Sequence, residues 1–170
     1  MRSILASGAL AALVSGCALE IATDPDTFSL DDGRLTHLKT TTPVVLQNRY
    51  NGPNNAELKM GPHTWVIDQH QLTNTAIAIL KRGMEKQGLA VAPAGERTVT
   101  LRVSVLGARV QGMAPVVQTN ARVSLEAELA DGTSLRFLGD NTSPWGAPRA
   151  FDGAVLFALN QLLIDPKFVA

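Results

Sequence analysis

The sequence TVTLRVSV occupies residues 98–105, and VQTNARVSLEAEL occupies residues 117–129. Apolar and polar residues alternate along both stretches, and a side-chain period of two places them on opposite faces of a strand. The two stretches therefore predict neighbouring strands of a sheet that is buried on one face and solvated on the other. A third strand of the same kind is predicted to hold Leu135 and Phe137.

The turn between the second and third strands fixes which residues face each other. A two-residue loop at 131–132 would set Phe137 against Glu126, and a buried residue would then oppose a charged one. A three-residue loop at 130–132, with its glycine in the left-handed conformation, instead sets Phe137 opposite Leu125. We therefore predict the three-residue loop.

The turn between the first two strands is predicted to span residues 111–115. This loop brings Val110 opposite Val116 and so pairs Val103 with Val123. That register also keeps the apolar residues of both strands on one face.

Two amphipathic helices are predicted on either side of these strands. Asp68 is a suitable N-cap for the first helix, and Gly88 stands just past its end as a C-cap. The second helix is predicted to run from about residue 148 to 164. Phe157 and Ile164 lie on the side away from its main apolar stripe, so this helix has more apolar surface than one sheet face needs.

A first strand is predicted to begin at Val44 and to end near Tyr50, before a cluster of turn residues at 51–55. Residues 57–67 stay ambiguous, because Gly61-Pro62 interrupts them. We therefore predict an α+β fold, a two-layer α/β sandwich with two helices on one face of a mainly antiparallel sheet of about four strands. The elements follow in the order β-α-β-β-β-α, in a single domain at residues 43–170.

The chain begins with Arg2 and an apolar run at residues 4–14 of about 11 residues. A helix that spans a bilayer needs roughly 20 residues, so this run is typical of a secretory signal peptide rather than of a membrane anchor. The single cysteine of the chain, Cys17, follows the run at once. The three residues before it are Val14, Ser15 and Gly16.

This aliphatic–small–small–cysteine sequence resembles the lipobox of bacterial lipoproteins. The resemblance implies that residues 1–16 are a signal peptide, that Cys17 carries a covalent lipid, and that the membrane is reached through this lipid. Ala18, in place of an aspartate, implies an outer-membrane location, which we expect to face the periplasm. Ordinary cleavage after a small residue is the alternative. Residues 17–42 show no periodicity and are predicted to form a tether or loosely packed arm. Apolar residues of this arm, such as Leu30, can dock on the domain.

Composition excludes several kinds of function. The 170 residues contain 15 Lys and Arg and 15 Asp and Glu, so the net charge is zero. Zero charge argues against binding to nucleic acid or to an anionic membrane through a basic field. The single cysteine excludes an internal disulfide and a cysteine-rich zinc site.

Residues with catalytic or metal-binding chemistry are few. His63, Asp68 and His70 are close in sequence and could together bind a metal ion. Asp68 and His70, however, are two residues apart at a helix start and do not share a helical face. We therefore expect no metal site and no cofactor besides the lipid. Glu126 and Glu128 share a strand face, where a solvated charge lattice is the simpler interpretation. The sequence has no Gly-x-Ser-x-Gly turn and no phosphate-binding glycine loop. We therefore expect no enzyme activity.

Binding to a partner protein is the class of function that remains. Trp65, Trp145 and Phe157 are candidate partner-binding residues. Packing at the edge of the core is the alternative for the tryptophans, and packing under the N-terminal arm or contact within an oligomer is the alternative for Phe157. The polar sheet face is interpreted as a solvated surface, and a docking face for another envelope protein is its alternative.

Taken with the lipobox, the order of elements resembles the small α/β outer-membrane lipoproteins of Gram-negative bacteria, including the auxiliary lipoproteins of ABC-type envelope transport systems. The resemblance implies a lipid-anchored, non-catalytic accessory or assembly partner of a cell-envelope complex. The alternative is a periplasm-facing module that binds a lipid or small hydrophobic ligand between helices and sheet. Such a pocket would be lined by Leu80, Met84, Val103 and Phe151.

Overall fold

A computed structural model describes residues 19–20, 30, 42–60, 63–113 and 116–169 of the chain. Its elements, in chain order, are β1 (Leu19–Glu20), β2 (Val44–Asn48), β3 (Asn55–Met60), β4 (His63–Asp68), α2 (Gln69–Lys86), β5 (Arg97–Met113), β6 (Val116–Leu129), β7 (Ser134–Ser143), α3 (Ala147–Leu162) and α4 (Pro166–Val169). The predicted α+β fold is confirmed.

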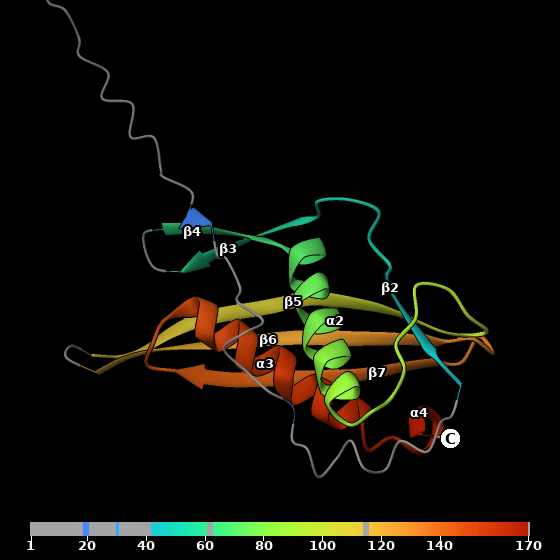
Figure 1. Cartoon of the computed structure of the whole chain (residues 1–170). Helices are drawn as coiled ribbons and strands as arrows, with labels where there is room; N and C mark the ends of the chain where they lie inside the picture. The colour runs from blue at the N-terminus through green and yellow to red at the C-terminus, as the bar shows by residue number, and fades with distance from the viewer. Residues whose placement is uncertain (1–18, 21–29, 31–41, 61–62, 114–115, 170) are drawn as a thin grey trace, which may run out of the picture.

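The larger sheet has four strands in the order β2-β5-β6-β7. β2 runs parallel to β5, and β5, β6 and β7 form an antiparallel meander. Helices α2 and α3 lie together on one face of this sheet (Figure 1). The core lies between these two layers and contains Leu80, Leu101, Leu125, Phe151 and Leu159, all with no exposed surface.

The ends of α2 are set by local chemistry. The side chain of Asp68 accepts a hydrogen bond from the backbone N–H of His70 at 2.9 Å, as an N-cap does. Gly88, just past the helix, has a φ of 75°, a left-handed conformation that glycine adopts without a steric cost. Both predicted caps are confirmed.

The β6–β7 hairpin has the predicted register. Leu129 donates a backbone hydrogen bond to Thr133, Gly132 has a φ of 82°, and Phe137 lies opposite Leu125. The apolar face is therefore continuous across these two strands.

The register predicted between β5 and β6 is wrong. Val103 lies opposite Leu125 instead of Val123, because the ladder continues to Met113 and Val116 and most of the expected loop belongs to the strands. The observed partner of Val103 is two residues away from the predicted one. A shift by an even number of residues keeps side chains on the same face, so the apolar residues of both strands still share one face.

A second, three-stranded sheet in the order β1-β4-β3 lies beside the first (Figure 1). It includes most of the segment that the sequence left ambiguous, with Leu58 opposite Trp65 in the antiparallel β3–β4 pair. Leu19 pairs with the same tryptophan from the parallel strand β1.

Two described parts of the predicted tether pack on the domain. The first is β1, which is hydrogen-bonded into the smaller sheet, and the second is Leu30, which is only 4% exposed and belongs to the core. Among the described residues, no helix is long and apolar enough to cross a bilayer.

Candidate functional site

The predicted lipidation site lies outside the described residues, and so do the lipobox residues before it. These residues are Val14, Ser15, Gly16 and Cys17. Their role stays a prediction from the sequence.

The candidate partner-binding residues lie on different elements. Trp65 is half-buried in β4 and packs against the core, Trp145 is 83% exposed between β7 and α3, and Phe157 is 50% exposed on α3. Phe157 lies ten positions beyond the first residue of α3, roughly 15 Å along the helix axis, and Trp145 precedes that residue, so the two exposed aromatic side chains do not form one compact patch.

The four residues expected to line a ligand pocket are fully buried. Leu80, Met84, Val103 and Phe151 each have 0% exposed surface. A side chain that lined a cavity of ligand size would present accessible surface to it, so these residues are packed core.

The structure brings no metal-binding constellation together in its described part. Among those residues, no group of three or more His, Cys, Asp or Glu side chains could hold a metal ion. Asp68 is instead used as the α2 cap, as the sequence indicates.

Ion pairs cross the strands on the sheet face that points away from the helices. The pairs are Arg49 with Glu128 at 3.0 Å, Arg102 with Glu126 at 3.8 Å, and Arg122 with Asp140 at 3.2 Å. Their side chains are roughly 30–55% exposed, so each pair contributes little to stability, on the order of 0–1 kcal/mol. The pairs do order the side chains of this face, which we call the outer sheet face.

Tyr50, just past the end of β2, contacts β5 on the outer sheet face. Its hydroxyl accepts a hydrogen bond from Nε of Arg102 at 3.2 Å and lies 3.2 Å from Oγ of Ser104, and the guanidinium carbon lies 5.4 Å from the centre of the ring. The hydrogen bond to Tyr50 raises the pKa of Arg102 above its ordinary value, so this side chain stays charged.

A β-bulge interrupts β5 near the middle of this face. Val105 lies opposite Val123 and Gly107 lies opposite Arg122, which leaves Leu106 as the extra residue. Leu106 is 48% exposed. Because Gly107 has no side chain, the surface is hollowed here.

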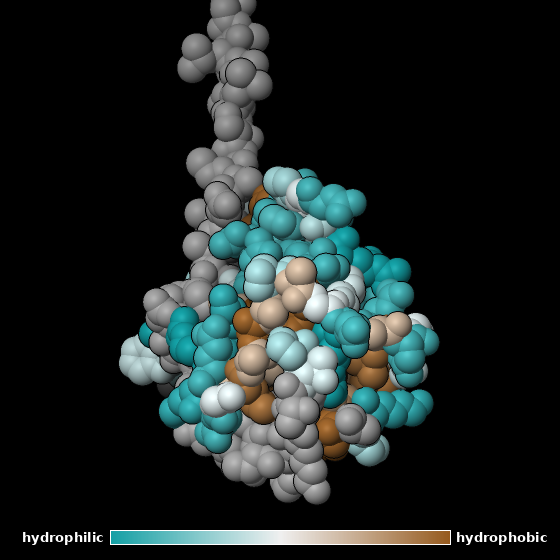
Figure 2. Space-filling model, turned by 45° about the vertical axis from the view of Figure 1, so that its right-hand side comes forward, coloured by the Kyte–Doolittle hydropathy of each residue, from teal (hydrophilic) through white to brown (hydrophobic). Residues whose placement is uncertain are grey.

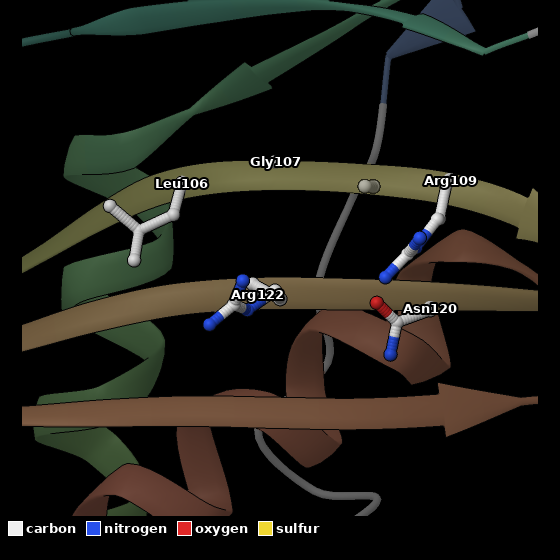
Figure 3. A pocket seen from close by; sticks show the side chains of 6 residues that line it. Leu106, Gly107, Arg109, Asn120 and Arg122 are labelled. Carbon is white, nitrogen blue, oxygen red and sulfur yellow. The ribbon is translucent and has the colours of Figure 1, made fainter.

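The hollow is an open depression of about 230 Å³. Figure 3 shows Arg109 of β5 and Asn120 of β6 pointing toward each other across the two strands, with Leu106 and Arg122 farther along. The lining residues are Leu106, Gly107, Ala108, Arg109, Asn120 and Arg122.

Leu138 adds a second exposed leucine to the outer sheet face. It lies on β7 opposite Ser124 and is 52% exposed. Sequence reasoning did not single out Leu106 or Leu138, although each stands next to an inward apolar residue and so breaks the alternation. The pair Leu106-Gly107 within a strand is also a bulge signal.

The rest of the surface is largely hydrophilic where it can be seen. Figure 2 shows a face on which the described hydrophobic residues form small, separate patches among hydrophilic ones. Exposed apolar side chains are therefore scattered rather than gathered on that face.

Comparison with known proteins finds a solved structure of similar architecture. No family model matches the chain, and no curated protein matches it. The crystal structure of protein XCC0632 from Xanthomonas campestris (DUF330) is similar, with a TM-score of 0.47 and 15% sequence identity, over 86% of this chain and 87% of that chain.

Proposed function

We propose that this protein is a lipid-anchored, non-catalytic accessory or assembly partner of a cell-envelope complex. Cys17 is its anchor, in the outer membrane and facing the periplasm. The sequence that ends the apolar run supports the anchor, because Cys17 follows a lipobox-like triplet. More than one acyl chain on this residue makes anchoring stable.

The contrast between core and surface carries the partner-binding part of the proposal. Leu80 and Phe151 are completely buried, whereas Trp145 is 83% exposed and Phe157 is 50% exposed. Tryptophan is among the residues that most often dominate binding energy at protein interfaces. An exposed tryptophan on a well-packed domain favours a protein that binds through its surface.

Binding of a hydrophobic ligand between helices and sheet has less support. It needs accessible apolar space beside residues such as Met84 and Val103, and neither has exposed surface. We therefore propose partner binding alone.

The anchor and the partner can be tested together in native envelopes. The full-length lipoprotein and its Cys17→Ala variant would be crosslinked in the envelope and purified, and palmitate incorporation would be measured for both. We expect label on the wild type only, and an envelope protein that is recovered with the wild type in higher yield. Absence of label on the wild type would contradict the anchor.

Surface variants separate partner binding from anchoring. Trp145→Ala is expected to lower recovery of the partner with the label unchanged, and Lys81→Ala, at an exposed position of α2, is the matched control. If the wild type recovers no protein above background while lipids co-purify with the domain, the partner proposal fails.

A further inference from the structure

The charges of the outer sheet face do not balance within the described residues. Its carboxylates Glu126, Glu128 and Asp140 are each paired with an arginine. Arg109 and Arg136 lie on the same face and form no ion pair within the described part of the chain, and Glu126, which lies opposite Arg136, pairs with Arg102 instead. Arg136 donates a hydrogen bond from Nε to Oγ of Ser124 at 2.9 Å, which leaves its terminal nitrogens available.

Each of these arginines stands near an exposed leucine on its own strand. Arg109 and Leu106 both line the depression beside the bulge of β5. Arg136 and Leu138 are two residues apart on β7, so they point to the same side. The central strand β6 lies between the two arginine–leucine pairs.

The bulge is what gives the first pair its shape. An extra residue in one strand re-aims side chains, and here both Leu106 and Gly107 fall on the outer sheet face. The absent side chain of Gly107 opens the space next to Leu106, where a partner side chain can enter. A purely solvated face needs neither the hollow nor the half-exposed leucines.

We propose that the outer sheet face docks a segment of an envelope protein in which acidic residues stand next to aliphatic ones. One carboxylate of that segment pairs with Arg109 while an aliphatic side chain contacts Leu106. A second carboxylate and aliphatic side chain meet Arg136 and Leu138. The inference rests on the proposed function, since it names the surface and the chemistry of the partner.

Charge complementarity favours a protein over a membrane surface as the occupant. Polybasic sites for anionic lipids use clusters of roughly four to eight Lys or Arg side chains. Here only Arg109 and Arg136 are in excess, they lie on different strands, and the whole chain has no net charge. A planar guanidinium next to a leucine instead fits a carboxylate with an aliphatic neighbour, through paired N–H donors.

The test is site-specific photocrosslinking of the full-length lipoprotein in its native envelope. The photoreactive residue p-benzoylphenylalanine would replace Leu106 or Leu138, and in parallel Trp145 or Phe157. The crosslinked peptides would then be sequenced. We expect the photoreactive residue at positions 106 and 138 to crosslink to the same protein. The crosslinked segment should contain Asp or Glu beside Leu, Ile or Val.

Charge reversal tests the role of the arginines. The double variant R109E/R136E is expected to lower the crosslinking yield from position 138 at least tenfold, while Lys81→Glu on α2 leaves it unchanged. Equal melting temperatures of these variants would show that folding is retained. If the yield is the same in the double variant, or the crosslinked segment has no acidic residue, the inference is wrong.

The remaining outcomes separate this inference from the proposed function. Lipid adducts alone at positions 106 and 138 would identify the membrane surface as the occupant and overturn the docking inference. Protein adducts from position 145 or 157 but not from 106 or 138 would overturn it and leave the proposed function standing. The absence of protein adducts at all four positions would contradict both.

Discussion

Asp68 caps the start of α2, and the same hydrogen bonds make its carboxyl group sensitive to pH. Burial raises the pKa of its carboxyl group, but hydrogen bonds from the backbone N–H groups of Asn54, His70 and Gln71 outweigh burial and lower the pKa below its ordinary value of 3.8. A carboxyl group whose pKa is lower in the folded state stabilises that state at neutral pH. This stabilisation is lost as the pH falls below about 3.8 and through the lowered value.

Replacing Asp68 tests the cap and its pH dependence. Asp68→Ala is expected to lower the free energy of unfolding by about 1 kcal/mol at pH 7, since an N-cap acceptor is lost. Asp68→Asn keeps an acceptor oxygen and should lie close to the wild type at pH 7. Urea denaturation at pH 7 and pH 3 measures both effects. The wild type should lose more stability than Asp68→Asn between these values, and equal losses would contradict the pKa shift.

Thr73 closes part of the edge of β5. Strand β2 pairs with β5 only as far as Leu101, and beyond it the N–H of Val103 donates to Oγ1 of Thr73 at 2.9 Å. The next inward residue, Val105, donates to Oε1 of Gln69 at 2.8 Å. The first turns of α2 thus satisfy backbone groups that a neighbouring strand would otherwise pair.

Loss of the Thr73 hydroxyl should therefore cost more than loss of its methyl group. Thr73 is fully buried, so the nearly isosteric Thr73→Val leaves the N–H of Val103 without an acceptor. The expected cost is about 1–3 kcal/mol. Thr73→Ser keeps the hydroxyl and is the matched control. Chemical denaturation gives the free energies, and faster amide exchange at Val103 in Thr73→Val alone would locate the effect. Equal stability of the two variants would refute this role.

At the scale of elements, α3 packs directly on β7 because one strand residue has no side chain. Gly139 lies opposite Val123, and a Cβ atom there would overlap the backbone carbonyl of Ala154. The carbonyl belongs to the helix, so it cannot move without displacing α3. Gly153 also lies in tight contact, but its neighbour is the side-chain amide of Asn141.

The two glycines make a matched pair of variants. Gly139→Ala is expected to destabilise by about 3 kcal/mol or more, because overpacking against backbone shifts a whole element. Gly153→Ala should cost much less, since the Asn141 amide can rotate away from its weak hydrogen bonds of 3.3 and 3.4 Å, and alanine favours a helix by about 1 kcal/mol over glycine. Thermal unfolding compares them. A Gly139→Ala variant as stable as Gly153→Ala would show that α3 has room to shift.

These elements also show which features were predictable. The α2 caps and the β6–β7 turn depend only on residues next to each other in the sequence. Asp68, Gly88 and Gly132 therefore indicate them before the fold is known. The β5–β6 register depends on a bulge and on a ladder that continues to Met113 and Val116, which a regular alternation cannot reveal. Strands β3 and β4 are short and flank Gly61-Pro62, so their pairing becomes evident only in the fold.

The candidate site was predictable only in part. The sequence places the charged residues on one sheet face, since they alternate with the core residues. It does not show which arginines are left without a carboxylate, because that depends on pairs such as Arg122 with Asp140 across strands. The depression depends on the bulge at Leu106 and therefore escaped prediction with it.

At the scale of the whole molecule, the docking of β1 changes how far the domain can lie from the proposed lipid on Cys17. An extended chain spans at most about 3.6 Å per residue. If residues 17–42 were a free tether, the domain could be up to roughly 90 Å from the anchor. Because Leu19 pairs with Trp65 in β4, only Ala18 stands between the proposed anchor at Cys17 and the smaller sheet, and these two residue steps give a reach of about 7 Å.

We therefore predict that the smaller sheet lies against the membrane, and two insertions can test this. In a Trp145→Phe background, Trp65 is the remaining one of the two tryptophans, and spin-labelled lipid headgroups can quench it. Ten Gly and Ser residues between Ala18 and Leu19 add roughly 17 Å of reach and should reduce quenching. The same insertion between Thr42 and Pro43 should leave quenching unchanged.

The position of the insertion decides between a docked arm and a free tether. In a docked arm, the path from Cys17 to the domain runs through β1, so residues added after it do not lengthen the path. In a free tether, every added residue lengthens the same path, and both insertions would reduce quenching equally. Leu30→Ala supplies an independent measure, because removing a core leucine should lower the free energy of unfolding by about 2–5 kcal/mol. A small effect at Leu30, together with equal quenching in both insertions, would return residues 17–42 to the role of a flexible tether.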